Sequence, residues 1–241
     1  MTSTSVATGP TSAPMNLIAR FIGVITAPRA TFESIVSHPK VLGMLLLTAT
    51  ITALGAALPM TTDAGKQATI DSQVKTMESF GMTVTDEMYA GFQKGTDMLP
   101  YTTGGSVLVM TPIIIAILSG MLFAVYNGAL GGEASFKQIY AVITHAGVIS
   151  AVGQFFTGPL NYFRGSVSSA TNLSALLPML DDGSFIGKLA GMIDLFFIWW
   201  LIVLAIGLAV LYRRKTQPTA MTLFGIYAVI ALCFAAYLSR G

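Results

Sequence analysis

The chain has 241 residues, of which 54% are hydrophobic and only 10% are charged, and its formal net charge is +2. Soluble domains carry about 25% charged residues, so this composition excludes a soluble protein with a water-exposed surface of ordinary polarity. A net charge of +2 is also too small to indicate a nucleic-acid partner.

Five long apolar stretches follow one another along the chain, each close to the length of about 20 residues that crosses a bilayer. They cover about 41–60, 106–130, 138–157, 190–212 and 220–238, and nearly all the charge lies between them. We therefore predict an all-α, polytopic membrane protein with five transmembrane helices in one domain, residues 15–241. Residues 1–14 are small, polar and uncharged, so we expect a disordered tail there and no signal peptide.

The segment before the first stretch predicts two short helices. One apolar stripe has helical spacing and consists of Leu17, Ile18, Phe21, Ile22 and Ile25. Pro28 ends this helix and can sit in the first turn of the next, which Pro39 closes. The stripe fits an amphipathic pair lying in the membrane interface, and it fits equally well a pair packed against the bundle.

The first loop, 61–105, is long and acidic. Ile70, Val74 and Met77 have helical spacing, and Thr85 can cap a second helix that begins with Asp86. We expect two short helices broken near Gly81.

The later connections differ in length. Residues 128–137 and 213–218 predict tight hairpins, with Ser135 as a helix cap and Pro218 in the first turn of the last helix. Between them, 158–185 is rich in Ser, Asn, Gly and Pro, which predicts a loop. The basic cluster Arg213, Arg214 and Lys215 follows directly on an uncharged stretch. Such clusters stay in the cytoplasm, so we expect the N-terminus inside and the C-terminus outside.

Little in the chain could carry chemistry. The sequence has no paired cysteines, no clustered metal ligands and no phosphate-binding glycine loop, so we predict no catalytic residue, cofactor or metal. His145 and Asp194 are the ionisable residues expected at membrane depth, where such groups are functional candidates. Their depths should differ by roughly 10–15 Å, which argues against a direct pair. A histidine bonded to another helix and an aspartate serving as an interfacial cap or as a partner of Lys188 or Arg164 are the structural alternatives.

Rows of small residues predict close helix packing. They are Ala49, Ala53 and Ala57 in the first stretch, and Gly187, Gly191, Ala205 and Ala209 around the fourth. Such rows serve packing within a bundle and can also join copies of a chain into a homo-oligomer.

Three segments in order resemble the Yip family of integral membrane proteins, named in eukaryotes for interaction with Ypt/Rab GTPases. The segments are Ala27–Ile35 followed by Pro39, Gly131–Ile139, and Asp194–Trp199 continuing through Ala205–Gly207. The resemblance covers about Asn16 to Leu238 and is greatest to the prokaryotic branch, because the N-terminal segment is short and the first loop is long. It implies a five-helix bundle with a cytoplasmic N-terminus and, in eukaryotic relatives, roles in vesicle trafficking and membrane shaping through protein partners.

Two hypotheses follow from these observations. The first is a non-enzymatic scaffold or partner-binding subunit in the lipid bilayer, acting through a protein partner or as a homo-oligomer. The alternative is a small transporter or channel that uses His145 and Asp194. A closed apolar bundle centre would favour the scaffold, and a water-filled cavity at His145 would favour transport.

Overall fold

The structure, a computed structural model, describes residues 15–177, 179–181 and 183–239. The tail expected over residues 1–14 lies outside this part of the chain. Within the described part the regular elements are helices, and an isolated β-bridge joins Asn172 to Asp194. The predicted all-α class is confirmed.

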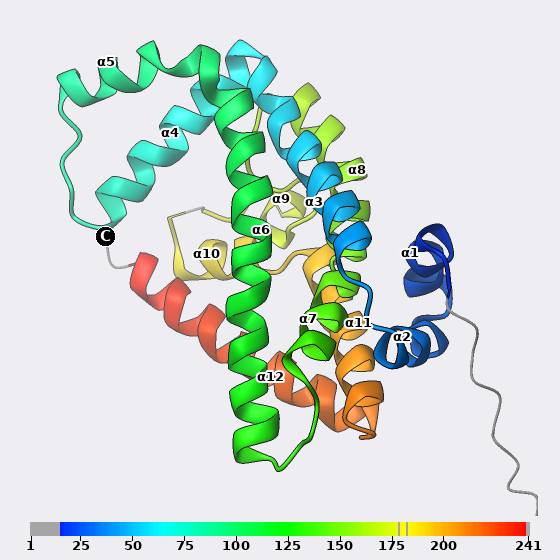
Figure 1. The fold of residues 1–241 in the computed structure, drawn as a ribbon. Coiled ribbons are helices and arrows are strands. Elements are labelled where there is room, and N and C mark those ends of the chain that lie inside the picture. Colours follow the sequence, from blue (N-terminus) through cyan, green and yellow to red (C-terminus); the bar gives the residue numbers. More distant parts are fainter. Residues whose placement is uncertain (1–14, 178, 182, 240–241) are drawn as a thin grey trace, which may run out of the picture.

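Four helical runs are long and apolar enough to cross a membrane in the described residues: Leu42–Thr61, Thr96–Ala129, Phe136–Arg164 and Thr216–Leu238. The fourth predicted stretch forms α11 (Leu195–Leu211), which is apolar throughout but has only 17 residues. The five apolar helices thus comprise four of full spanning length and one slightly shorter. Figure 1 shows α6 upright at the front of the bundle and α12 crossing it obliquely.

The four long runs are built from consecutive elements. α3 (Leu42–Ala57) continues into a 3-10 turn, and α6 (Leu99–Phe123) is preceded by a 3-10 turn and followed by a π-helical segment. α7 (Phe136–Ala146) and α8 (Val148–Arg164) meet at Gly147, and α12 (Thr216–Leu238) is unbroken. The remaining bounds are Leu58–Thr61 and Thr96–Met98 for the two 3-10 turns and Ala124–Ala129 for the π segment.

Three helices have bounds that differ from those of the predicted apolar stretches. The second helix begins at Leu99, before residue 106, because the small polar residues at its start remain helical. The third continues to Arg164 through the Gly158–Pro159 pair that predicted a loop. The fourth begins at Leu195, after residue 190, because Ile193 and Asp194 are extended and separate it from a preceding short helix.

Shorter helices form in the two long loops. α4 (Asp63–Ser79) and α5 (Asp86–Lys94) form the predicted pair in the first loop. Gly81 separates them with φ of 77°, a conformation that favours glycine, and the Thr85 hydroxyl accepts from the Met88 N–H. α9 (Leu173–Leu176) and α10 (Phe185–Met192) occupy the last loop.

A close helix crossing explains why α8 does not end at Gly158. A Cβ on Gly158 would lie 3.0 Å from the Gly55 carbonyl oxygen and 3.1 Å from the Gly55 Cα. The backbones of α3 and α8 therefore approach each other directly at these two glycines. Ala49 and Ala53, from the predicted small-residue row, are buried inside the bundle beside this crossing, and Ala205 and Ala209 are buried on α11.

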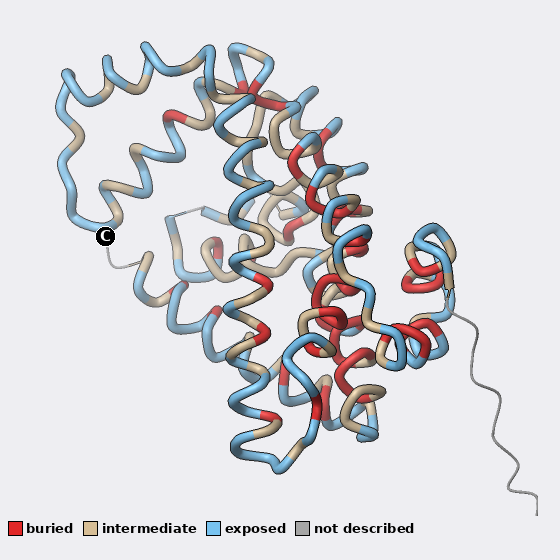
Figure 2. Tube along the Cα trace, in the orientation of Figure 1, coloured by how far each residue is buried: buried red, intermediate tan, exposed pale blue. Residues whose placement is uncertain are grey.

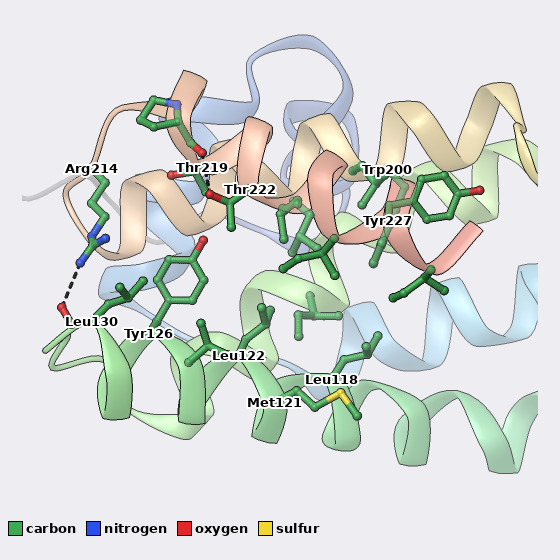
Figure 3. Close-up of a pocket in the computed structure, with 18 of the residues that line it drawn as sticks. Leu118, Met121, Leu122, Tyr126, Leu130, Trp200, Arg214, Thr219, Thr222 and Tyr227 are labelled. Carbon is green, nitrogen blue, oxygen red and sulfur yellow. Dashed lines mark hydrogen bonds between the residues drawn. The ribbon is translucent and has the colours of Figure 1, made fainter. Parts of the chain in front are cut away.

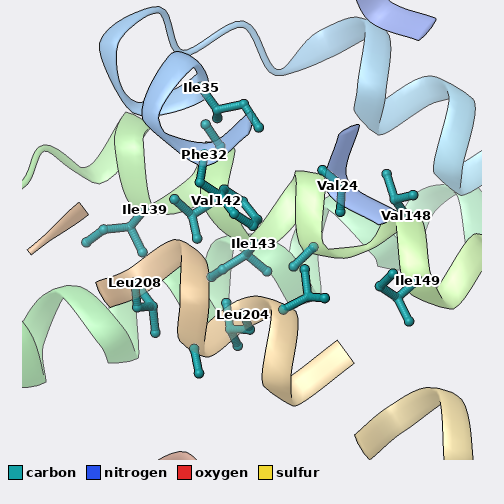
Figure 4. Packing of buried hydrophobic residues seen from close by; sticks show 14 of the residues in the cluster. Val24, Phe32, Ile35, Ile139, Val142, Ile143, Val148, Ile149, Leu204 and Leu208 are labelled. Carbon is teal, nitrogen blue, oxygen red and sulfur yellow. The ribbon is translucent and has the colours of Figure 1, made fainter. Parts of the chain in front are cut away.

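The apolar core lies where α2 (Pro28–Ser37), α7, α8 and α11 meet. Figure 4 shows side chains from these helices and from α1 (Leu17–Thr26) interlocking, and Figure 2 shows the buried residues concentrated there. Phe32, Ile35 and Val142 are fully buried in this core, as are Ile149 and Leu208. Burial is therefore greatest around α7, the helix nearest the middle of the bundle.

The outer faces of the spans remain apolar and uncovered. α6 exposes Ile114 and Ile117, and α12 exposes Val229 and Ile230. Exposed apolar surface of this extent on full-length helices is the pattern of contact with lipid. The fold therefore agrees with an integral membrane protein.

Candidate functional site

His145 lies sealed inside the bundle. Its side chain is fully buried on α7, and its Nδ1 lies 2.7 Å from the Ala141 carbonyl oxygen on the same helix. Because a carbonyl can only accept, Nδ1 carries the proton. The buried Nε2 has no hydrogen-bond partner among the described residues. The expectation that the imidazole bonds to another helix is therefore not met, because the partner carbonyl is one turn earlier in its own helix.

Asp194 is the N-cap of α11. Its Oδ1 accepts from the backbone N–H groups of Phe196 at 2.9 Å and Phe197 at 3.1 Å. Its Oδ2 accepts from the hydroxyls of Ser169 at 2.6 Å and Thr171 at 2.7 Å. The carboxylate thus satisfies the start of the helix and holds the preceding loop against it.

These two ionisable groups do not form one site. Each has its own separate set of hydrogen-bond partners, and neither donates to or accepts from the other. Neither Lys188 nor Arg164 forms a salt bridge with Asp194 in the described part of the chain. A groove of about 470 Å³ with both polar and apolar lining adjoins Asp194 and includes Gln154. Nothing in this arrangement links that groove to His145.

The two tight hairpins join each other through an aromatic pair. We call this cluster the hairpin junction: Tyr126, Asn127, Gly132, Tyr212 and Arg214. The rings of Tyr126 and Tyr212 stack with centroids 4.6 Å apart, and the Tyr212 hydroxyl donates to Asn127 Oδ1 at 2.9 Å. A Cβ on Gly132 would lie 2.5 Å from the Tyr212 ring, so only glycine fits there.

The backbone turn at the end of α11 sets the position of the basic cluster Arg213, Arg214 and Lys215. The N–H of Arg213 donates to the Val210 carbonyl at 3.3 Å, and the N–H of Arg214 donates to the Ala209 carbonyl at 2.8 Å. These two bonds form a Schellman motif, with Arg213 at φ of 52° in the left-handed region that glycine usually occupies. The turn brings Arg214 back over the junction, where its Nη2 donates to the Leu130 carbonyl at 3.0 Å. Arg213, Arg214 and Lys215 are all exposed.

Sequence reasoning missed the role of Arg20. The apolar stripe of α1 fitted either an interfacial face or a face packed on the bundle. Ile18 and Ile22 are 69% and 52% exposed, whereas Arg20 is only 2% exposed. Its guanidinium donates to the carbonyls of Met15 at 3.1 Å, His38 at 3.2 Å and Lys40 at 3.4 Å. Burial lowers the pKa of Arg20 from its ordinary value, but a guanidinium stays protonated in proteins. Arg20 thus fixes α1 to the turn that leads into α3.

The N-terminal pair therefore combines the two arrangements that its sequence allowed. α2 is packed in the core through Phe32 and Ile35, and α1 buries Val24 against it. The outer face of α1 remains apolar and uncovered, as an interfacial helix requires. In the sequence, Arg20 stands beside the apolar stripe. The sequence alone could not show which side of α1 faces the bundle.

No cluster of metal-ligating side chains is present among the described residues. Within residues 15–177, 179–181 and 183–239, no group of three or more His, Cys, Asp or Glu residues could hold a metal ion. The polar groups that do come together, at Asp194 and at the hairpin junction, bond to backbone and to hydroxyls. Their arrangement serves packing and helix termination.

Comparisons with known proteins agree with this architecture. The model of the Yip1 domain matches residues 22–238. The chain is also similar to the membrane protein YknW of Bacillus subtilis (strain 168), with 26% identity over 217 residues, covering 87% of each chain. No solved structure matches the chain. The family match spans nearly the whole segment over which the three sequence motifs were found.

Proposed function

Because this chain belongs to the Yip1 domain family, we propose that it is a non-enzymatic integral membrane scaffold that binds a protein partner at the bilayer surface. The closed apolar centre of the bundle carries this proposal. His145 is fully buried, and both carboxylate oxygens of Asp194 already accept hydrogen bonds. A carrier that used His145 would need a wet path to this side chain, so its burial supports packing and partner binding over conduction.

The N-terminal pair supplies the surface for the partner. On α1, Leu17, Ile18 and Ile22 are 40%, 69% and 52% exposed and form one apolar face. Arg20 holds the opposite face in place through three backbone carbonyls. A rigidly held apolar face at the membrane surface is suited to contact both lipid headgroups and a partner helix.

The orientation belongs to the same proposal. The exposed basic cluster Arg213, Arg214 and Lys215 supports a cytoplasmic position for the hairpin junction, because such clusters stay inside by the positive-inside rule. With five crossings, the N-terminal pair is then cytoplasmic and the C-terminus is outside. A reporter enzyme that is active only outside the cell, fused after the last residue, is expected to be active. Activity of a cytoplasm-dependent reporter at the same position would contradict the orientation.

Site-specific photocrosslinking tests the scaffold directly. A photoreactive amino acid at Ile18 in native membranes is expected to give one discrete protein adduct. Val229, which is 62% exposed on α12, is the matched control and is expected to give only lipid adducts. Lipid adducts alone at both positions, together with recovery of the chain without any companion after gentle solubilisation, would contradict the proposal.

A further inference from the structure

An apolar groove opens between α6, α11 and α12 beside the hairpin junction, as Figure 3 shows. Its volume is about 480 Å³, which lies in the range of small-molecule sites. Leu201 and Leu204 form a buried floor, whereas Met121 and Ile226 at the rims are 60% and 50% exposed. The groove is therefore open on one side and faces the apolar surroundings of the spans.

One end of the groove carries an uncompensated positive charge. Arg214 lines this end, with its guanidinium carbon 5.9 Å from the centroid of the Tyr126 ring. Among the described residues, the Arg214 side chain forms one hydrogen bond, from Nη2 to the Leu130 carbonyl. Neither of the salt bridges between described residues involves Arg214, so no described carboxylate neutralises its charge.

The other end of the groove is apolar. Trp200 and Ile230 line it, and the Tyr227 hydroxyl there donates to the Met192 carbonyl. With that hydroxyl bonded within the chain, Phe197, Leu201 and Ile230 give the far end a mostly apolar lining. The groove therefore has a cationic end at the membrane surface and a hydrocarbon-like interior, the polarity of a single phospholipid molecule.

We propose that this groove binds one anionic glycerophospholipid, with its phosphate on Arg214 and an acyl chain over Leu204 and Trp200. A guanidinium matches a phosphate in charge and in hydrogen-bond geometry. Arg213 and Lys215 are exposed next to it and add attraction for anionic headgroups. A free phosphate would leave the apolar length of the groove unused, so a membrane lipid is the occupant that satisfies both ends.

The two tryptophans of the chain allow a direct measurement. Trp199 contacts Phe196 and does not line the groove, so Trp199→Phe leaves Trp200 as the reporter. Trp200 lies about 16 Å along α11 from its end at Leu211, at 1.5 Å per residue. The middle of an acyl chain whose phosphate sits on Arg214 reaches this depth. Lipids brominated at mid-chain therefore quench Trp200 fluorescence when they occupy the groove.

The experiment compares brominated phosphatidylglycerol with brominated phosphatidylcholine in vesicles that contain the full chain. Phosphatidylglycerol is expected to quench at about fivefold lower mole fraction, the preference that one basic residue near the surface provides. Arg214→Gln should abolish the preference. Arg29→Gln removes another exposed charge, one that does not line the groove, and should retain the preference. Equal quenching by both lipids, or a preference that survives Arg214→Gln, would overturn the proposal.

A second variant tests lipid entry into the groove without changing the residues of the hairpin junction. Thr222→Phe places a ring at an exposed groove position and leaves Arg214 unchanged. The preference for phosphatidylglycerol is expected to disappear because the phenyl ring blocks entry of the lipid acyl chain into the groove. A preference that persists, or a wild-type Trp200 that neither lipid quenches because protein covers the groove, would show that no lipid is bound there.

Discussion

Arg20 shows how one buried charge can organise an interfacial segment. Its three carbonyl acceptors come from the start of α1 and from the turn before α3, so a single side chain joins elements that would otherwise meet only through apolar contacts. A charged hydrogen bond stabilises more than a neutral one, and a buried carbonyl left without a donor is costly. The position of α1 beside the bundle therefore depends on this guanidinium.

Arg20→Ala is expected to lower the free energy of unfolding by about 2–3 kcal/mol, because three part-buried hydrogen bonds from a charged donor are lost. Equilibrium unfolding in mixed micelles, followed by circular dichroism, measures the change. Arg29→Ala is the matched control, since the Arg29 side chain is 66% exposed, and it should change stability by less than about 0.5 kcal/mol. Equal effects of the two variants would contradict the role given to Arg20.

Asp194 is expected to act through hydrogen-bond geometry rather than through its charge. Asp194→Ala should cost about 1–2 kcal/mol of stability, the usual effect of losing an N-cap. Asp194→Asn keeps an oxygen for the N–H groups of Phe196 and Phe197, so it should recover at least about half of that loss. The same unfolding assay compares the two. If the asparagine variant is as unstable as the alanine variant, the negative charge itself is required.

At the scale of elements, the crossing of α3 and α8 depends on the absence of side chains at Gly55 and Gly158. The sequence Gly158–Pro159 predicted the end of a helix, because both residues break helices in isolation. In the bundle, the close approach of the two backbones provides packing that outweighs this local preference. The same residues that weakened the helix prediction are those that allow the helices to touch.

Gly158→Ala is expected to destabilise the protein by about 1–3 kcal/mol, because its methyl group would force apart the backbones of α3 and α8. Gly120→Ala is the control. Gly120 also lies within a helix, but a Cβ there would meet nothing within 4 Å. The control should be neutral or more stable by up to about 1 kcal/mol, since alanine favours helix. A similar loss in both variants would rule out a special role for the crossing.

At the scale of the whole molecule, periodicity and length predicted the class, the apolar helices, the helix pair in the first loop and the two hairpins. Local rules sufficed there, as with Ser135, whose hydroxyl and Gln138 form a capping box. They failed where tertiary contacts decide the outcome. Residues distant in sequence determine the burial of Arg20, the extension of α8 to Arg164 and the stacking of Tyr126 on Tyr212. Of the candidate site residues, the sequence identified His145 and Asp194 but not their partners.

The central claim is that the middle of the bundle is closed and dry, so that the protein works through its surfaces. Cysteine accessibility in open membrane fragments tests this claim most directly. In a Cys233→Ser background, Ala146→Cys places a thiol beside His145 at a fully buried position, and Gln73→Cys places one on exposed α4. A charged, water-soluble thiol reagent should label position 73 completely and position 146 only after unfolding. Rapid labelling of position 146 in the native membrane would reveal a water-filled pathway to His145 and contradict the scaffold account.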